Sequence, residues 1–220
     1  MYMLLQENTL LDYIDAVDSN SPTPGGGSVA ALVGALGACL AKMLANFSVE
    51  KKKFLQASDS EKQKYILAMS EIDKNKDILV NGIDADAFSY QGVLDAYASK
   101  DEKKIEEALS ASCFVAFELQ DAACNALKYL DKLVALGNKY VMSDLHSGAI
   151  LLYSCVELCH LNVMANANAM LNDKVKEYYL ENGKSCVQKA KRYKLRVLNS
   201  IKNNHWILFQ TKVLKCLSFF

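Results

Sequence analysis

The fold is decided by a stretch near the start of the chain, SPTPGGGSVAALVGALGA (residues 21–38). Its first part, residues 22–28, holds both prolines of the protein and three of its ten glycines. Elsewhere strong helix breakers are few, and the alternating Val, Ile and Thr runs that predict strands are rare. The sequence therefore predicts one rigid loop in an otherwise helical chain.

Apolar residues recur with helical spacing along most of the chain. We expect a single-domain, all-α bundle of long, mostly antiparallel helices over residues 1–204. A C-terminal tail follows at residues 205–220, and its sequence leaves its order undecided. The predicted helices are residues 4–17, 28–49, 60–98, 102–109, 113–136, 143–171 and 173–203. The helix at 28–49 is rich in Ala and Gly and apolar nearly all round, which is typical of a central helix packed by several neighbours.

The composition excludes several classes of protein. Lys and Arg balance Asp and Glu at 25 each, which argues against a broad nucleic-acid footprint. Residues 29–40 are the most apolar segment and are too short for a bilayer, which takes roughly 20 apolar residues. The N-terminus lacks the basic, then apolar, pattern of a signal peptide. The seven cysteines form no CxxC pair, so we expect reduced thiols and a cytoplasmic protein without a membrane or nucleic-acid partner.

The glycine-rich loop leads directly into the predicted helix at 28–49. The first amides of a helix lack internal partners, and the helix dipole places partial positive charge there. Because residues 28–32 carry no acidic side chain, this end suits a carboxylate or phosphate. We assign the loop to substrate binding, through Pro24, Gly25, Gly26, Gly27 and Ser28. The alternative, a tight structural turn with Ser28 as a cap, has equal weight on this pattern alone.

An aspartate interrupts the apolar stripe of the predicted helix at 60–98. The stripe contains Tyr65, Met69, Ile72, Lys76, Leu79, Ile83, Asp86, Tyr90, Val93 and Tyr97. A core-facing aspartate must be paired, hydrogen-bonded or functional, and burial raises its pKa toward the range useful in acid–base catalysis. Asp84 lies about 200° around the helix and should face elsewhere. Asp86 is therefore a candidate catalytic residue, or a structural one satisfied by a neighbouring helix end.

Polar residues later in the chain offer weaker candidates. Ser143 and Asp144 fit a helix cap and an acid that compensates the helix dipole, and we also assign both to substrate binding. Cys155 and Cys159 share a helix face, but His160 points about 100° away and no fourth ligand is evident. We expect no metal site there.

Several segments together resemble the formiminotransferase-cyclodeaminase family, specifically its cyclodeaminase domain and the free-standing methenyltetrahydrofolate cyclohydrolases. The segments are residues 21–31 (SPTPGGGSVAA), 34–38 (GALGA), 51–54 (KKKF), 83–88 (IDADAF), 137–138 (GN) and 143–145 (SDL). Their order and spacing cover about residues 5–203. Two departures stand out: Glu50 replaces the glycine that often precedes the lysine run, and the tail after Asn204 has no recognised counterpart.

The resemblance implies an all-helical bundle that works as a homodimer or larger homo-oligomer, with a tetrahydrofolate substrate and no metal or further cofactor. It places the family's catalytic aspartate at Asp86, the residue that the stripe also singles out. We expect hydrolysis of 5,10-methenyltetrahydrofolate to 10-formyltetrahydrofolate. One alternative is ammonia elimination from 5-formiminotetrahydrofolate, and another is a folate-binding subunit without catalytic activity.

Overall fold

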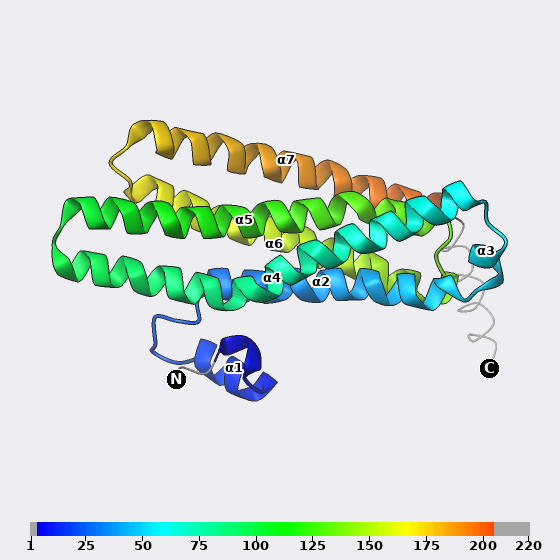
Figure 1. The fold of residues 1–220 in the computed structure, drawn as a ribbon, viewed down its shortest axis with the longest axis horizontal. Coiled ribbons are helices and arrows are strands. Elements are labelled where there is room, and N and C mark those ends of the chain that lie inside the picture. Colours follow the sequence, from blue (N-terminus) through cyan, green and yellow to red (C-terminus); the bar gives the residue numbers. More distant parts are fainter. Residues whose placement is uncertain (1–3, 205–220) are drawn as a thin grey trace, which may run out of the picture.

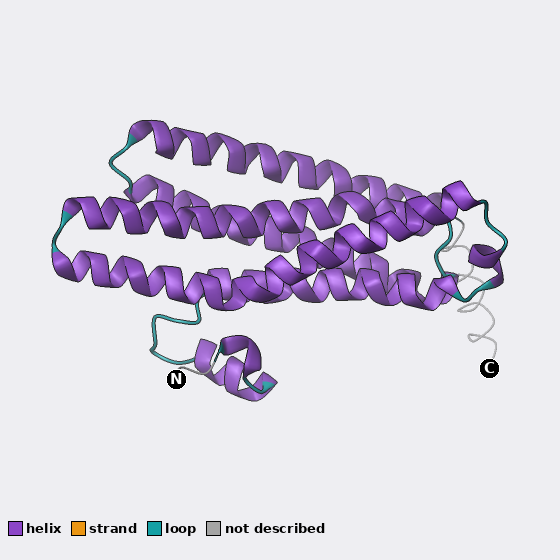
Figure 2. Ribbon diagram, viewed as in Figure 1, coloured by secondary structure: helices purple, strands orange, loops and turns teal. Residues whose placement is uncertain are grey.

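The computed structural model describes residues 4–204, and every regular element in that range is a helix (Figures 1 and 2). The long helices are α2 (Gly26–Val49), α4 (Asp59–Ser99), α5 (Glu102–Val134), α6 (Met142–Ala169) and α7 (Asp173–Asn203). The short ones are η1 (Leu5–Glu7), α1 (Leu10–Val17), α3 (Lys52–Leu55) and η2 (Lys139–Val141). The predicted all-α fold is confirmed, and the tail at 205–220 lies outside the described residues.

Successive long helices run in opposite directions along an elongated bundle (Figure 1). The turn between α4 and α5 contains Lys100, which has a left-handed backbone (φ 56°) that ends α4. Asp101 then caps α5 by accepting the amides of Lys103 and Lys104. A capping box of Ser58 and Glu61 starts α4. These local signals explain why long helices form and where they stop.

Helix α2 packs against α6 and α4 at close range because its buried face is made of small residues. A Cβ atom on Gly34 would lie 2.7 Å from the sulfur of Cys155 on α6. One on Gly37 would lie 2.9 Å from the carbonyl oxygen of Gly148. The glycines therefore permit the backbone of α2 to approach α6, and the prediction of a central, closely packed helix is confirmed.

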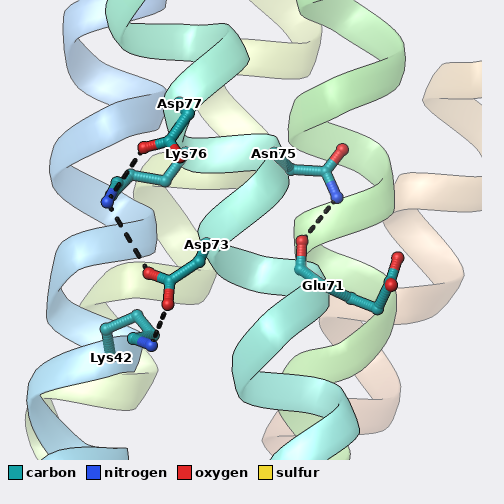
Figure 3. A network of polar contacts seen from close by, with 6 residues as sticks. All are labelled: Lys42, Glu71, Asp73, Asn75, Lys76 and Asp77. Atoms are coloured by element: carbon teal, nitrogen blue, oxygen red, sulfur yellow. Dashed lines mark hydrogen bonds and ion pairs between the residues drawn. The ribbon is translucent and has the colours of Figure 1, made fainter.

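One ion pair joins α2 to α4 beside this core, and two more lie within α4 (Figure 3). Lys42 on α2 pairs with Asp73 on α4. The ammonium of Lys76 lies 3.0 Å from Asp77 and 3.6 Å from Asp73. Lys76 interrupts the apolar stripe in the sequence, and these pairs explain how α4 accommodates the charge there.

Three predicted helix boundaries are wrong. The helices expected at 102–109 and 113–136 are one continuous helix, α5, in which the buried Ser112 hydroxyl accepts a hydrogen bond from Asn166 (3.1 Å). The helix expected at 4–17 is interrupted before Thr9, which caps α1. The lysine run expected in a connection contains the short helix α3.

The helix expected to start at Ser143 begins at Met142, and its N-cap, Val141, makes no side-chain cap bond. Ser143 is therefore not a cap, which corrects the sequence prediction. The capping side chain in this connection is Asn138, which accepts the amide of Tyr140 and starts η2 instead.

Two segments of the described chain are long and apolar enough to cross a membrane by length and composition, namely α2 and residues 139–169. Their most apolar windows are 56% and 39% buried inside the bundle. Both segments are core helices of this fold, and their hydropathy follows from that position.

Candidate active site

The N-terminus of α2 has no cap of its own. Gly25 is the N-cap residue and offers no side chain, and the first turn contains no acidic residue. The peptide bond from Thr23 to Pro24 is cis. The free amides at this helix end, which the sequence assigns to anion binding, therefore depend on an acceptor from elsewhere.

That acceptor is Asp86 on α4. The amide of Ser28 donates a hydrogen bond to Oδ2 of Asp86 (2.9 Å). A Cβ atom on Gly27 would lie 2.0 Å from Oδ1 of the same carboxyl, so only glycine allows this approach. The structure thus brings together Gly27, Ser28 and Asp86, three of the residues that the sequence assigned to the site.

The two oxygens of Asp86 have different environments. Oδ2 accepts the Ser28 amide, whereas no group within residues 4–204 donates a hydrogen bond to Oδ1. Burial raises the pKa of this carboxyl, and the Ser28 amide offsets part of the rise. Asp86 therefore satisfies a helix end and also keeps one oxygen available for a ligand or a proton.

Asp84 is also buried, which the helical spacing did not predict. It points to the N-terminal segment, where its Oδ1 accepts the amide of Leu5 (2.6 Å) and its Oδ2 accepts that of Gln6 (3.3 Å). With both oxygens engaged by backbone amides, Asp84 anchors η1 to α4. The difference in oxygen occupancy favours Asp86 over Asp84 as the reactive carboxyl.

Sequence reasoning missed Tyr13, the buried side chain of α1. Its hydroxyl lies 2.9 Å from Oγ of Ser28, which is itself fully buried. Burial raises the pKa of Tyr13, while the hydrogen bond to Ser28 lowers it and Asp86 and Asp84 raise it. A tyrosine among the leucines of an amphipathic helix gives no sequence signal for this contact.

Ser143 and Asp144 do not join the rest of the site within one chain. They lie in the first turn of α6, next to η2, and Asn138 before η2 donates its amide to Oγ of Ser48 (2.8 Å). Ser48 is twenty residues along α2 from Ser28, or about 30 Å at 1.5 Å per residue. The loop and these two residues thus occupy opposite ends of α2.

Two further features are not part of the group formed by Gly27, Ser28 and Asp86. A cavity of about 690 Å³ opens between α2 and α4, with Lys42, Phe47 and Lys76 among its lining residues, and Asp86 is not one of them. The sulfurs of Cys155 and Cys159 are 3.9 Å apart in the core. Within residues 4–204, no group of three or more His, Cys, Asp or Glu side chains is placed to hold a metal ion.

Comparison with known proteins gives consistent matches. The chain is 28% identical over 204 residues to the methenyltetrahydrofolate cyclohydrolase of Methylorubrum extorquens, covering 89% of this chain and 96% of that protein. It is 30% identical to the formimidoyltransferase-cyclodeaminase of Rattus norvegicus over 89% of this chain, and spans only 38% of that protein. The corresponding mouse protein is 29% identical, with 90% of this chain and 37% of that protein covered.

A solved structure shares the fold. The formiminotetrahydrofolate cyclodeaminase of Thermotoga maritima superposes with a TM-score of 0.82 at 24% identity, covering 90% of this chain and 98% of that one. The family model for formiminotransferase-cyclodeaminase matches residues 9–184, which include the glycine loop, Asp86 and most of the bundle. The chain therefore belongs to the formiminotransferase-cyclodeaminase family.

Proposed function

We propose that the protein is a methenyltetrahydrofolate cyclohydrolase, which hydrolyses 5,10-methenyltetrahydrofolate to 10-formyltetrahydrofolate. The observation that carries the proposal is the Asp86 carboxyl, held against the N-terminus of α2, with a raised pKa and with no donor to its Oδ1 among residues 4–204. The match to the Methylorubrum extorquens cyclohydrolase over 96% of that protein supports this reaction.

The chemistry needs a base and a counter-charge, and Asp86 fits both needs. Water adds to the cationic methenyl carbon and loses a proton to the carboxylate. The bond from that carbon to N5 then breaks while the added hydroxyl group becomes the formyl C=O, its proton passes to N5, and the formyl group remains on N10. The negative carboxylate also stabilises the cationic methenyl group before attack. Hydrolysis thus consumes one water, removes the positive charge of the methenyl group and releases one proton.

The helix end supplies a second kind of contact. The Ser28 amide donates to Asp86, while the amides of Gly26 and Gly27 donate to no acceptor among residues 4–204. These two amides and the dipole of α2 suit a carboxylate of the substrate or a developing negative charge. The glycine loop is thus assigned to holding the folate beside Asp86.

Ammonia elimination from 5-formiminotetrahydrofolate is the second candidate reaction, because the rodent relatives are named for a cyclodeaminase activity. In that reaction N10 attacks the formimino carbon and ammonia leaves. Proton transfer by one carboxyl could serve either chemistry, so Asp86 does not discriminate between them.

We further propose that two copies of the chain associate through α2. Its outer face is an apolar stripe that the bundle leaves partly exposed, with Leu36 and Phe47 51% and 53% exposed. The stripe contains Val29, Leu32, Leu36, Leu40, Met43 and Phe47. Such a face extending along a whole helix is typical of a protein–protein contact.

The location of the stripe favours a two-fold contact. The stripe runs along both halves of α2. A two-fold axis perpendicular to the middle of the helix would therefore pair the N-terminal half of α2 in one copy with the C-terminal half of α2 in the other. The two α2 helices are then antiparallel. In that arrangement Ser143 and Asp144 of the second copy lie at the same end as the glycine loop of the first, which would unite the predicted site.

A paired absorbance assay on the purified protein tests the function. One arm follows the loss of 5,10-methenyltetrahydrofolate above its spontaneous hydrolysis, and the other follows its formation from 5-formiminotetrahydrofolate together with ammonia. Catalysed loss alone supports the cyclohydrolase. Catalysed formation with ammonia makes the protein a cyclodeaminase, and a folded protein inactive in both arms overturns both assignments.

A further inference from the structure

The N-terminal segment, residues 4–17, lies beside the bundle next to α2 (Figure 1). Few of its apolar side chains are buried: Leu5 packs against the core and Tyr13 is the only buried side chain of α1, whereas Leu10 stays 71% exposed. The hydrogen bonds that hold the segment to the bundle end at Asp84 and at Ser28. Asp84 is two residues from Asp86, and the backbone amide of Ser28 donates a hydrogen bond to Asp86. The segment is thus fastened to the two neighbours of the candidate catalytic carboxyl.

The bond between Tyr13 and Ser28 is a buried one. Oγ of Ser28 has no other hydrogen-bond partner within residues 4–204, and the residue is inaccessible to solvent. A buried hydroxyl that loses its partner is unfavourable, so this bond keeps Ser28 in one orientation. Burial raises the pKa of Tyr13 above its ordinary value, so at neutral pH the phenol keeps its proton and serves as a hydrogen-bonding group.

We propose that Tyr13 is a positioning residue for Asp86 and acts through Ser28. Ser28 connects the two, since its side chain binds the phenol and its backbone amide binds Oδ2 of the carboxyl (2.9 Å for each contact). The proposal rests on the proposed function and adds a residue to its site. It gives α1 a role in holding the geometry of the reacting group.

Loss of the phenol hydroxyl has a defined consequence. Ser28 loses the contact that fixes its side chain, and its amide then donates less well to Asp86. Because that amide favours the charged carboxylate, weakening it moves the titration of Asp86 to higher pH. A base held less well also lowers the rate of the chemical step more than it lowers substrate binding.

The test compares Tyr13→Phe and Ser28→Ala with the double variant. Each single variant should lower kcat about tenfold, with KM within about twofold, and should move the acid limb of kcat/KM to higher pH by about half a unit. The double variant should be no worse than either single one, because both changes break the same connection. Tyr178→Phe, which removes an exposed hydroxyl from α7, is the matched control and should leave both values unchanged.

A second readout needs no substrate. Carbon-13 NMR titration of the Asp86 carboxyl should give a higher pKa in Tyr13→Phe than in the wild-type protein, and Tyr178→Phe should match the wild type. A wild-type protein inactive on both folates would overturn the proposed function, while this titration would still test Tyr13. An unchanged Asp86 titration in folded Tyr13→Phe, or additive losses in the double variant, would overturn the role of Tyr13. If one single variant does not fold, the other still breaks the contact.

Discussion

The carboxyl of Asp86 caps α2 through Oδ2, and its Oδ1 accepts no hydrogen bond from the described part of the chain, so its structural and chemical roles can be separated. In Asp86→Asn the amide oxygen can still accept the Ser28 amide, and we expect the free energy of unfolding to change by about 1 kcal/mol or less. The neutral amide cannot act as a base, so kcat should fall by at least about 100-fold. Asp95→Asn, an exposed change on the same helix, should keep wild-type activity. Near-normal turnover by Asp86→Asn would remove Asp86 from the mechanism.

The raised pKa of Asp86 also makes stability depend on pH. Its folded-state pKa lies above the unfolded value of about 3.9, so ionisation favours the unfolded state. This contribution to stability is fully present below the unfolded pKa and is lost as the pH rises through the folded pKa. In urea unfolding from about pH 4 upward, the wild-type protein should therefore lose stability relative to Asp86→Asn. Parallel curves for the two proteins would contradict this expectation.

Gly27 has a steric requirement that can be tested directly. A methyl group there would lie 2.0 Å from Oδ1 of Asp86, so Gly27→Ala must displace the carboxyl or the start of α2. We expect a loss of about 1–3 kcal/mol in stability and about 100-fold in kcat. Gly92→Ala is the control, since a Cβ atom there meets nothing within 4 Å. This substitution should stabilise α4 slightly, because alanine favours a helix more than glycine does. Equal stability and activity in the two variants would show that Gly27 and the Asp86 carboxyl are not in tight contact.

Among the elements, η1 depends most on a single residue of another helix. Asp84→Ala removes both acceptors for the amides of Leu5 and Gln6, so η1 should detach, while Tyr13 still holds α1 to Ser28 and the bundle stays folded. Hydrogen–deuterium exchange should show faster exchange at residues 5–7 and little change in α5 to α7. Asp95→Ala is the matched surface control. Unchanged protection at Leu5 and Gln6 would show that other contacts hold η1.

The long helices could be predicted from the sequence because each carries its own periodic apolar face and its own caps. The bounds of α7 match the prediction, since Asn172 caps its start. The continuity of α5 through residues 110–112 was not predicted, and the burial of Ser112 there depends on Asn166 of another helix, which the local sequence does not report. Helical spacing identified Asp86 on α4, whereas the burial of Asp84 depends on a distant segment that spacing does not report.

At the scale of the whole molecule, the site predicted from the sequence combines residues that lie far apart within one folded chain. The sequence prediction assigned Ser143 and Asp144 to the same substrate site as the glycine loop, yet the fold puts them about 30 Å away along α2. A sequence gives order along the chain, and neither the direction of a helix in the bundle nor the position of a second copy follows from it. The exposed stripe on α2 supports an assembly that removes this separation.

Mixing two inactive variants tests whether the site is shared between two copies. In the proposed antiparallel pair, one site combines Asp86 of the first chain with Asp144 of the second, and the other site the reverse. A pair made of one Asp86→Asn chain and one Asp144→Asn chain then keeps one intact site and should recover up to about half of wild-type activity, although each variant alone is inactive.

Adding Leu36→Glu to both chains should prevent the pairing and the recovery, because this change charges the apolar stripe, whereas Leu195→Glu on α7 should not. Light scattering during gel filtration shows whether the Leu36→Glu and Leu195→Glu chains still pair. An inactive mixed pair would place each site within one chain, and an active Asp144→Asn protein would remove that residue from the site.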